Sequence, residues 1–190
     1  MEKNQILDYL EKNDVENKNV LKSFIKDHSE IYARENLYGH ITGSAFIINE
    51  QGDEGLLILH KKYNKWVAPG GHVDPNEDAK IASKRESGEE VGLNDLELMS
   101  EEIFDIDIHR IPEAIKNGKL EPEHWHFDVR YLYKAPENCI VDVNLFETKG
   151  FKWEKLSNLA NETDISIQRQ ANKAINFVQN NLKQQRKFKL

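Results

Sequence analysis

The sequence predicts a mixed α/β domain with helices at both ends, and three observations support this fold class. Apolar residues recur every three or four positions near both ends of the chain, as in amphipathic helices. Between these segments lie short runs rich in β-branched and aromatic residues, as in strands. The chain has 190 residues, enough for one compact core but few for two. We therefore expect a helical extension over residues 1–36, packed on a single domain spanning residues 37–190.

The first 36 residues predict two short amphipathic helices, separated near Asn13 and Asp14. The apolar positions that define them lie at spacings near three and four: Ile6, Leu7, Leu10, Val20, Leu21, Phe24, Ile25 and Tyr32. Such helices could form a homodimer contact, act as a lid, or simply pack on the core. The pattern alone leaves these three roles open.

Strand-like runs follow from His40 onward. Residues 41–48 and 56–60 flank a turn rich in Asn, Gly and Asp, which predicts a hairpin. Further strands are expected over residues 104–111 and 125–133, and around Phe151 and Trp153. A C-terminal helix should span about residues 164–183, capped by Thr163 or Asp164. Its basic end favours a solvated helix terminus over a nucleic-acid contact: Lys183, Arg186, Lys187 and Lys189.

Charge and composition exclude several classes of protein. Lys and Arg number 26 against 33 Asp and Glu, and a net charge of −7 argues against a dedicated binder of duplex nucleic acid or of anionic membranes. Cys139 is the only cysteine, which excludes an intrachain disulfide and a cysteine-rich zinc site. No apolar run approaches the ~20 residues of a membrane span, and the polar start lacks a secretory signal pattern. We expect a cytoplasmic protein without a membrane partner.

Residues 66–93 predict a glycine-rich loop that enters a helix. Asp74 suits the N-cap, Pro75 suits the first helical position, and Glu77 can reach back to Asp74 in a variant of the capping box. Gly92 suits the left-handed residue that ends a helix. The helix between these signals should have about four turns.

Three carboxylates on this predicted helix, those of Glu86, Glu89 and Glu90, share one face because residues three and four positions apart are neighbours. They repel one another unless a cation lies between them, and oxygen ligands of this kind suit Mg²⁺ or Mn²⁺. Arg85, four positions before Glu89, can offset part of the repulsion. For the carboxylates taken alone, an ordinary solvated acidic helix is the competing interpretation.

The complete spacing resembles the Nudix box, G-x5-E-x7-R-E-U-x-E-E-x-G-U, in which U is a bulky aliphatic residue. Residues 71–93 match it at Gly71, Glu77, Arg85, Glu86, Glu89, Glu90, Gly92 and Leu93. Ser87 departs from the first U position, which should weaken packing under the helix but removes no charged group. Residues 56–72 look like the strand and glycine turn that precede the box in many bacterial Nudix hydrolases. Residues 104–112 and 124–131 look like paired segments of one bacterial subgroup.

The resemblance implies an α/β/α sandwich with a mixed sheet, in which the box holds divalent metal against a diphosphate. It implies catalytic roles for Arg85, Glu86, Glu89 and Glu90, with Glu86 as the base for water. The implied metal ligands are the Gly70 carbonyl and the carboxylates of Glu86, Glu89 and Glu90. Arg85 and Glu77 would pair and orient the carboxylates. The implied cofactor is Mg²⁺, with Mn²⁺ as a substitute.

The implied activity is a Mg²⁺-dependent pyrophosphohydrolase acting on a small-molecule nucleotide. Its substrate would be a nucleoside diphosphate linked to another moiety, such as ADP-ribose or an NDP-sugar. A nucleoside triphosphate pyrophosphatase, including one for oxidised dNTPs, is the alternative, and removal of a 5′ diphosphate from RNA is a third enzymatic option. A non-catalytic nucleotide-binding regulatory domain belongs to another class, and it would be expected to lose box carboxylates.

The segment from His124 to Tyr133 alternates between an aromatic face, expected in the core, and a polar face. The polar face carries His124, His126, Asp128 and Arg130. We favour lining of the substrate cleft for these residues, while an exposed or structural role and a transition-metal site of the His-x-His-x-Asp type stay open. A similar alternation at residues 105, 107 and 109 favours an exposed strand face.

Overall fold

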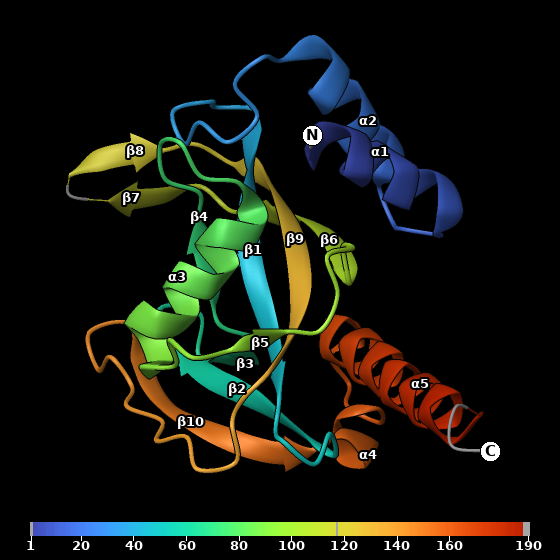
Figure 1. Ribbon diagram of the computed structural model, residues 1–190. Coiled ribbons are helices and arrows are strands. Elements are labelled where there is room, and N and C mark those ends of the chain that lie inside the picture. Colours follow the sequence, from blue (N-terminus) through green and yellow to red (C-terminus); the bar gives the residue numbers. More distant parts are fainter. Residues whose placement is uncertain (1, 117, 188–190) are drawn as a thin grey trace. The chain divides into compact units, whose positions relative to one another are not determined.

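The protein is described by a computed structural model over residues 2–116 and 118–187 (Figure 1). Helices lie at both ends of the chain, with strands and the box helix between them, as the sequence predicts, and the mixed α/β class is confirmed. In chain order the elements are α1 (Glu2–Lys12), α2 (Lys18–Asp27), β1 (Gly39–Ile48), β2 (Glu54–His60), β3 (Lys65–Val67), β4 (Gly70–His72), α3 (Ala79–Val91), β5 (Glu97–Leu98), β6 (Asp105–Ile111), β7 (Ala114–Lys116), β8 (Lys119–Glu121), β9 (His124–Lys134), β10 (Thr148–Lys155), α4 (Leu156–Leu159) and α5 (Ile165–Lys187).

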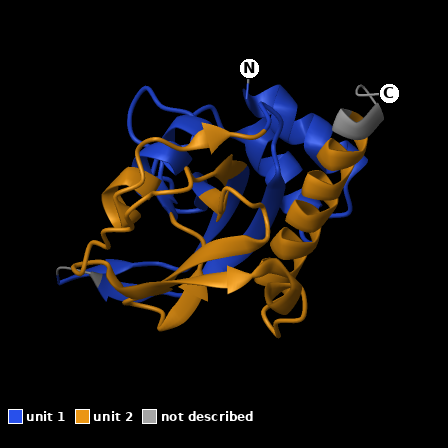
Figure 2. Ribbon diagram, turned by 60° about the horizontal axis from the view of Figure 1, so that its bottom comes forward, with its two compact units in different colours: residues 1–44, 70–86, 100–131 blue, residues 45–69, 87–99, 132–190 orange. Residues whose placement is uncertain are grey.

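The chain divides into two compact units, shown in blue and orange in Figure 2. The first unit contains Met1–Ser44, Gly70–Glu86 and Ser100–Tyr131, and the second contains Ala45–Pro69, Ser87–Met99 and Leu132–Leu190. The strands β1 and β9 and the helix α3 continue from one unit into the other. The N-terminal helices belong to the first unit.

In the first unit, two antiparallel strand pairs form the framework. Strand β4 pairs with the first half of β1, where Thr42 is opposite His72, and β6 pairs with β9 from Asp105↔Arg130 to Ile111↔His124. The helices α1 and α2 bury their apolar faces, which include Ile6, Leu10, Leu21 and Phe24. The Phe24 ring lies 4.7 Å from that of Phe127 on β9. The helical extension therefore contributes directly to this unit's core.

In the second unit, β2 is the central strand. It pairs antiparallel with the end of β1, with β3 and with β10, while β5 pairs with the end of β9. The predicted hairpin of β1 and β2 is confirmed. A Cβ at Gly55 of β2 would lie 3.1 Å from Leu159 of α4, so this helix packs closely on the strand.

The helical ends refine several predictions. Asp164 is the cap of α5, because its Oδ1 accepts the amide hydrogens of Ser166 at 3.0 Å and of Ile167 at 3.2 Å. Helix α2 ends at Asp27, so Tyr32, which the spacing placed on a helix, lies in the following loop. The basic tail is described only in part: Lys183 is exposed, the side chains of Arg186 and Lys187 are not described, and Lys189 lies outside the described residues. None of the described helices is long and apolar enough to cross a bilayer.

Candidate functional site

Helix α3 begins at Ala79, and the prediction that it starts at Pro75 with Asp74 as its cap is wrong. Asn76 has a left-handed φ of 71°, which interrupts a right-handed helix at this point. Glu77 does reach back to accept the Asp74 amide hydrogen, at 3.2 Å, but this contact closes a turn before the helix. The cap is instead Asp78, whose Oδ1 accepts the Ile81 amide hydrogen at 2.9 Å.

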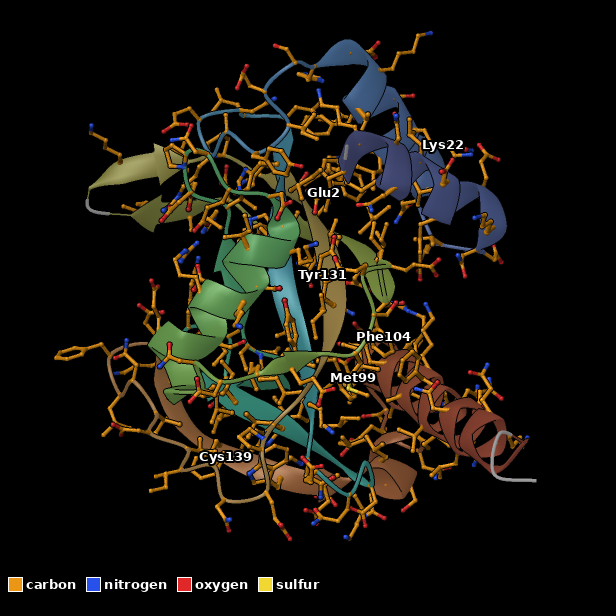
Figure 3. The ribbon with its side chains drawn as sticks, viewed as in Figure 1. Glu2, Lys22, Met99, Phe104, Tyr131 and Cys139 are labelled. Carbon is orange, nitrogen blue, oxygen red and sulfur yellow. The ribbon has the colours of Figure 1, made fainter. Side chains whose placement is uncertain are left out.

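A second carboxylate at the start of α3 comes from α1. The Glu2 side chain is buried, and it accepts hydrogen bonds from the Ala79 amide at 3.1 Å and from the Tyr131 hydroxyl at 3.0 Å. The Tyr32 hydroxyl also donates to it. Figure 3 labels Glu2 and Tyr131. A negative charge at the N-terminus of α3 interacts favourably with the helix dipole, which contributes up to ~2 kcal/mol in partly buried geometry. The local sequence around Glu2 carries no signal for this long-range contact.

Arg85 is the centre of a hydrogen-bond network in the box. Its guanidinium donates to both carboxylate oxygens of Glu77, at 3.0 and 3.1 Å from Nε, and to Glu86 Oε1 at 2.9 Å from Nη1. It also donates to the His72 carbonyl oxygen at 2.8 Å. The hydrogen bond between Arg85 and Glu77 is the largest cause of two pKa shifts. It lowers the pKa of the Glu77 carboxyl and raises the pKa of the Arg85 guanidinium. The Arg85–Glu77 pairing implied by the resemblance is present.

Two glycines bring the backbone close to this network. A Cβ at Gly71 would collide with the Glu86 carboxylate, and a Cβ at Gly70 would collide with Ser44 on the paired strand β1. Glycine is therefore required at position 70, where a Cβ would also meet the backbone of β1, whereas a side chain at position 71 would displace the Glu86 carboxylate. The resulting arrangement keeps the space beside the Glu86 carboxylate clear of side-chain atoms from residue 71.

The second half of α3 carries the other box carboxylates. Glu89 is exposed, whereas Glu90 is buried and its carbonyl oxygen accepts the Asn144 amide hydrogen at 2.9 Å. Gly92 ends the helix with a left-handed φ of 72°, as predicted. Ser87, at the departure from the box pattern, is fully buried. One continuous helix therefore carries Glu86, Glu89 and Glu90.

Arg130 and three aspartates form a buried charged group, which we call the Arg130 network: Asp105, Asp107, Asp128 and Arg130. The guanidinium lies 2.7 Å from Asp128, 3.1 Å from Asp105 and 3.6 Å from Asp107. Burial opposes the charge on Arg130, but the three carboxylates together raise its pKa. Asp128 also accepts hydrogen bonds from Thr42 at 3.1 Å and from Ser44 at 2.7 Å.

This network corrects the expectation of an exposed face at residues 105–109. Asp105 is buried against Arg130 because β6 pairs with β9 in the register Asp105↔Arg130, whereas His109 is exposed as expected. Substrate contact by Asp128 and Arg130 stays a prediction. Their observed partners are internal to the first unit.

The two histidines of β9 lie beside a third one that the sequence pattern did not single out. The His40 ring on β1 is 5.2 Å from that of His124 and 4.7 Å from that of His126, measured between centroids. The His72 ring of β4 lies 5.0 Å from that of His40. His40 and His124 are buried, and His126 is half-buried.

Comparisons with known proteins agree with this geometry. The family model of the NUDIX domain matches residues 40–174. A putative 8-oxo-dGTP diphosphatase of Bacillus subtilis is 40% identical over 52 residues, which are 27% of this chain and 35% of that protein. The aligned stretch thus spans about a third of that relative's length.

Solved structures match over a larger part of the chain. A NUDIX-family hydrolase from Clostridium perfringens is 28% identical with a TM-score of 0.53, covering 73% of this chain and 97% of its own. An Ap4A hydrolase from C. elegans is 22% identical with a TM-score of 0.54, covering 74% of this chain and 98% of its own. These likenesses confirm the fold that the box pattern implies.

Proposed function

The chain belongs to the Nudix family, and on this premise we propose that it is a Mg²⁺-dependent pyrophosphohydrolase. The proposed substrate is a nucleoside diphosphate linked to another moiety, such as ADP-ribose or an NDP-sugar. The observation that carries the proposal is the complete set of box carboxylates on α3, with Arg85 bound to both Glu77 and Glu86. A nucleotide-binding domain without activity would not need this set intact.

The residues of the box fit a divalent cation with oxygen ligands. The carboxylates of Glu86, Glu89 and Glu90 and the Gly70 carbonyl are hard donors, which suit Mg²⁺ and allow Mn²⁺ as a substitute. Gly71 supports this assignment, because any side chain there would collide with the Glu86 carboxylate. When bound, the ion neutralises diphosphate charge and lowers the pKa of a coordinated water.

The protein's own groups supply positioning and proton transfer in this proposal. Glu86 Oε1 accepts a hydrogen bond from Arg85, which orients the carboxylate that serves as the base for water. Glu77 holds Arg85 through two oxygens and thereby acts as a positioning residue. Substrate contact by His124 and His126 on β9 stays a prediction.

A nucleoside triphosphate pyrophosphatase is the second candidate. The 40% identity over 52 residues to the putative 8-oxo-dGTP diphosphatase favours it. The two candidates differ in the group beyond the diphosphate and in the products. Hydrolysis of a triphosphate releases pyrophosphate and a monophosphate, whereas a linked diphosphate gives two phosphate-containing products.

The test is a hydrolysis assay with product identification by mass. The panel contains ADP-ribose, NDP-sugars, dinucleoside polyphosphates, canonical and oxidised dNTPs, and 5′-triphosphate RNA, each with Mg²⁺ and with a chelator. Metal-dependent cleavage of the linked diphosphates supports the first candidate, and preferential cleavage of dNTPs supports the second. Tight nucleotide binding without turnover on any substrate contradicts both.

Matched variants test the role of the box carboxylate. Glu86→Gln keeps the side-chain volume but removes a base and ligand, so turnover should fall by about 10²–10⁴-fold. Glu101→Gln makes the same chemical change at an exposed residue outside the box, where the carboxylate pairs with Lys80, and should leave turnover near that of the wild type. Equal activities of the two variants would contradict the assignment of Glu86.

A further inference from the structure

Three histidines of the first unit converge, and we call His40, His124 and His126 the histidine cluster. Strands β1 and β9 bring them together at their first residues, where the Trp125 amide donates to the Tyr38 carbonyl oxygen at 2.9 Å. Gly39 permits the close approach, because a Cβ there would lie 2.5 Å from the Trp125 carbonyl oxygen. One ring nitrogen from each histidine lies within 4.8 Å of the others.

The spacing of these nitrogens suits a single ion. Nitrogens that share one tetrahedral Zn²⁺ lie roughly 3.3 Å apart, given Zn–N bonds of about 2.0–2.1 Å. The observed limit of 4.8 Å exceeds this by an amount that small rotations of imidazole rings can close. The three ligands come from two paired regions of backbone, so the site requires no large rearrangement of the chain.

The hydrogen bonding of the rings is the second observation. His40 is 1% exposed, yet neither of its ring nitrogens has a hydrogen-bond partner among the described residues. His124 Nδ1 lies 2.8 Å from the Pro122 carbonyl oxygen, which can only accept, so Nδ1 is the donor and Nε2 is the nitrogen left for a metal ion. A metal-bound histidine has this arrangement, since its second nitrogen donates to a carbonyl or carboxylate.

The protonation state of the rings agrees with this geometry. Burial, followed by the charges of the neighbouring histidines, lowers the pKa of His40 to about 3 and that of His126 to about 2. At neutral pH the rings of His40 and His126 are therefore uncharged. A metal ion requires the neutral imidazole.

A purely structural role explains these features poorly. A buried ring nitrogen without a partner destabilises a fold, and an apolar side chain of similar size would avoid this cost. The nearby Arg130 network shows that this unit does satisfy buried polar groups elsewhere. Among the described residues, Gln170 Oε1 of the second unit is the other buried side-chain atom without a partner, so within the first unit this feature is confined to His40.

We propose that His40, His124 and His126 bind one transition-metal ion, Zn²⁺, at a site separate from the box carboxylates. Three imidazole nitrogens favour Zn²⁺ over Mg²⁺, which prefers oxygen ligands, so the two sites select different ions. Three protein ligands leave a fourth position for water or for a ligand atom. This site goes beyond the proposed hydrolase activity and does not depend on it.

The test is calorimetric titration of the chelator-treated full chain with Zn²⁺, together with Co²⁺ absorption in the visible range as a report on ligand geometry. We expect one Zn²⁺ per chain and a rise in melting temperature on binding. The variants His124→Asn and His126→Asn should each weaken binding at least ~10-fold. His60→Asn, a half-buried histidine of β2 outside the cluster, should bind as the wild type does.

Glu86→Gln separates this proposal from the box metal. If Zn²⁺ binding survives in Glu86→Gln and is lost in the cluster variants, the proposal is supported even where the hydrolase activity fails. Absence of stoichiometric Zn²⁺ binding by the wild type overturns it. So does binding that Glu86→Gln abolishes while the cluster variants retain it. His40→Leu provides a ligand-loss variant that should stay folded, because it replaces a buried unpartnered ring with an apolar side chain.

Discussion

Strand β9 carries parts of two buried polar groups that differ in how their atoms are partnered. In the Arg130 network, one guanidinium meets three carboxylates, and Asp128 accepts two further hydroxyl hydrogens. The histidine cluster lies two residues earlier on the same strand and includes His40 of β1, whose pKa burial lowers and whose ring nitrogens have no hydrogen-bond partner among the described residues. The first group is complete within the protein. The second group is complete only with a ligand.

The difference separates a structural role from a binding role. Buried charges are tolerated where each one is paired, and their removal leaves an uncompensated partner. Buried polar atoms without partners lower stability, so their presence indicates a purpose other than folding. The same strand therefore supplies a rigid frame at Asp128 and Arg130 and a candidate ligand set at His124 and His126.

The largest expected effect comes from breaking the Arg130 network. Arg130→Met removes the cation but leaves Asp105 and Asp128 buried, so the free energy of unfolding should fall by about 3–5 kcal/mol in urea denaturation. Arg110→Met is the matched control, since Arg110 pairs with Glu123 at the surface and such pairs contribute about 0–1 kcal/mol. Equal losses in the two variants would show that burial of the network does not matter.

A pH titration probes the histidine cluster in metal-free protein. Because the folded pKa values of His40 and His126 lie near 3 and 2, against ~6.5 when unfolded, their full contribution to stability is present above pH 6.5 and is lost as pH falls. Between pH 6.5 and about 5, each should cost up to ~2 kcal/mol of unfolding free energy. The groups that act on these two rings are His72, His109, His124, Arg34 and Glu121. A flat profile over this range in urea denaturation would contradict neutral buried rings.

The smallest expected effect has the opposite sign. His40→Leu removes buried nitrogens without partners, so metal-free protein should gain ~1 kcal/mol in unfolding free energy, and its stability should depend less on pH than that of the wild type. Thermal and urea unfolding of the two proteins with a chelator provide the measurement. A clear loss of stability would mean that the His40 ring is part of the structural frame.

The sequence predicted the strands and helices well where periodicity is strong, as in β9 and α5, and it predicted the box helix but not its start. Asp74 and Pro75 form a good local start signal, yet the left-handed Asn76 ends it, and Asp78 takes over as the cap. Asp74 and Asp78 both have a side chain that suits a helix N-cap. The choice between them depends on the turn that Glu77 and Arg85 close, which is a tertiary contact.

The candidate sites were predictable only in part, for the same reason. The box has its residues within 23 positions of sequence, so its spacing identifies it. The histidine cluster draws His40 and His124 from positions far apart in the chain, and a single histidine at the start of a strand carries no signal. Asp105 was expected at the surface because alternation alone cannot distinguish an exposed polar face from a buried polar face with paired charges. Only the register with Arg130 shows that Asp105 is buried.

The Glu2 carboxylate has a consequence for how this chain can vary among its relatives. It accepts hydrogen bonds from Tyr32, Tyr131 and the Ala79 amide at once. We therefore expect the first helix and the Tyr131 hydroxyl to be retained or lost together during evolution. A lineage that loses the helix loses a buried carboxylate that accepts from the Tyr131 hydroxyl, and the preference for tyrosine over phenylalanine at position 131 then weakens. Presence of the N-terminal helices and tyrosine at this position should therefore rise and fall together across homologous sequences.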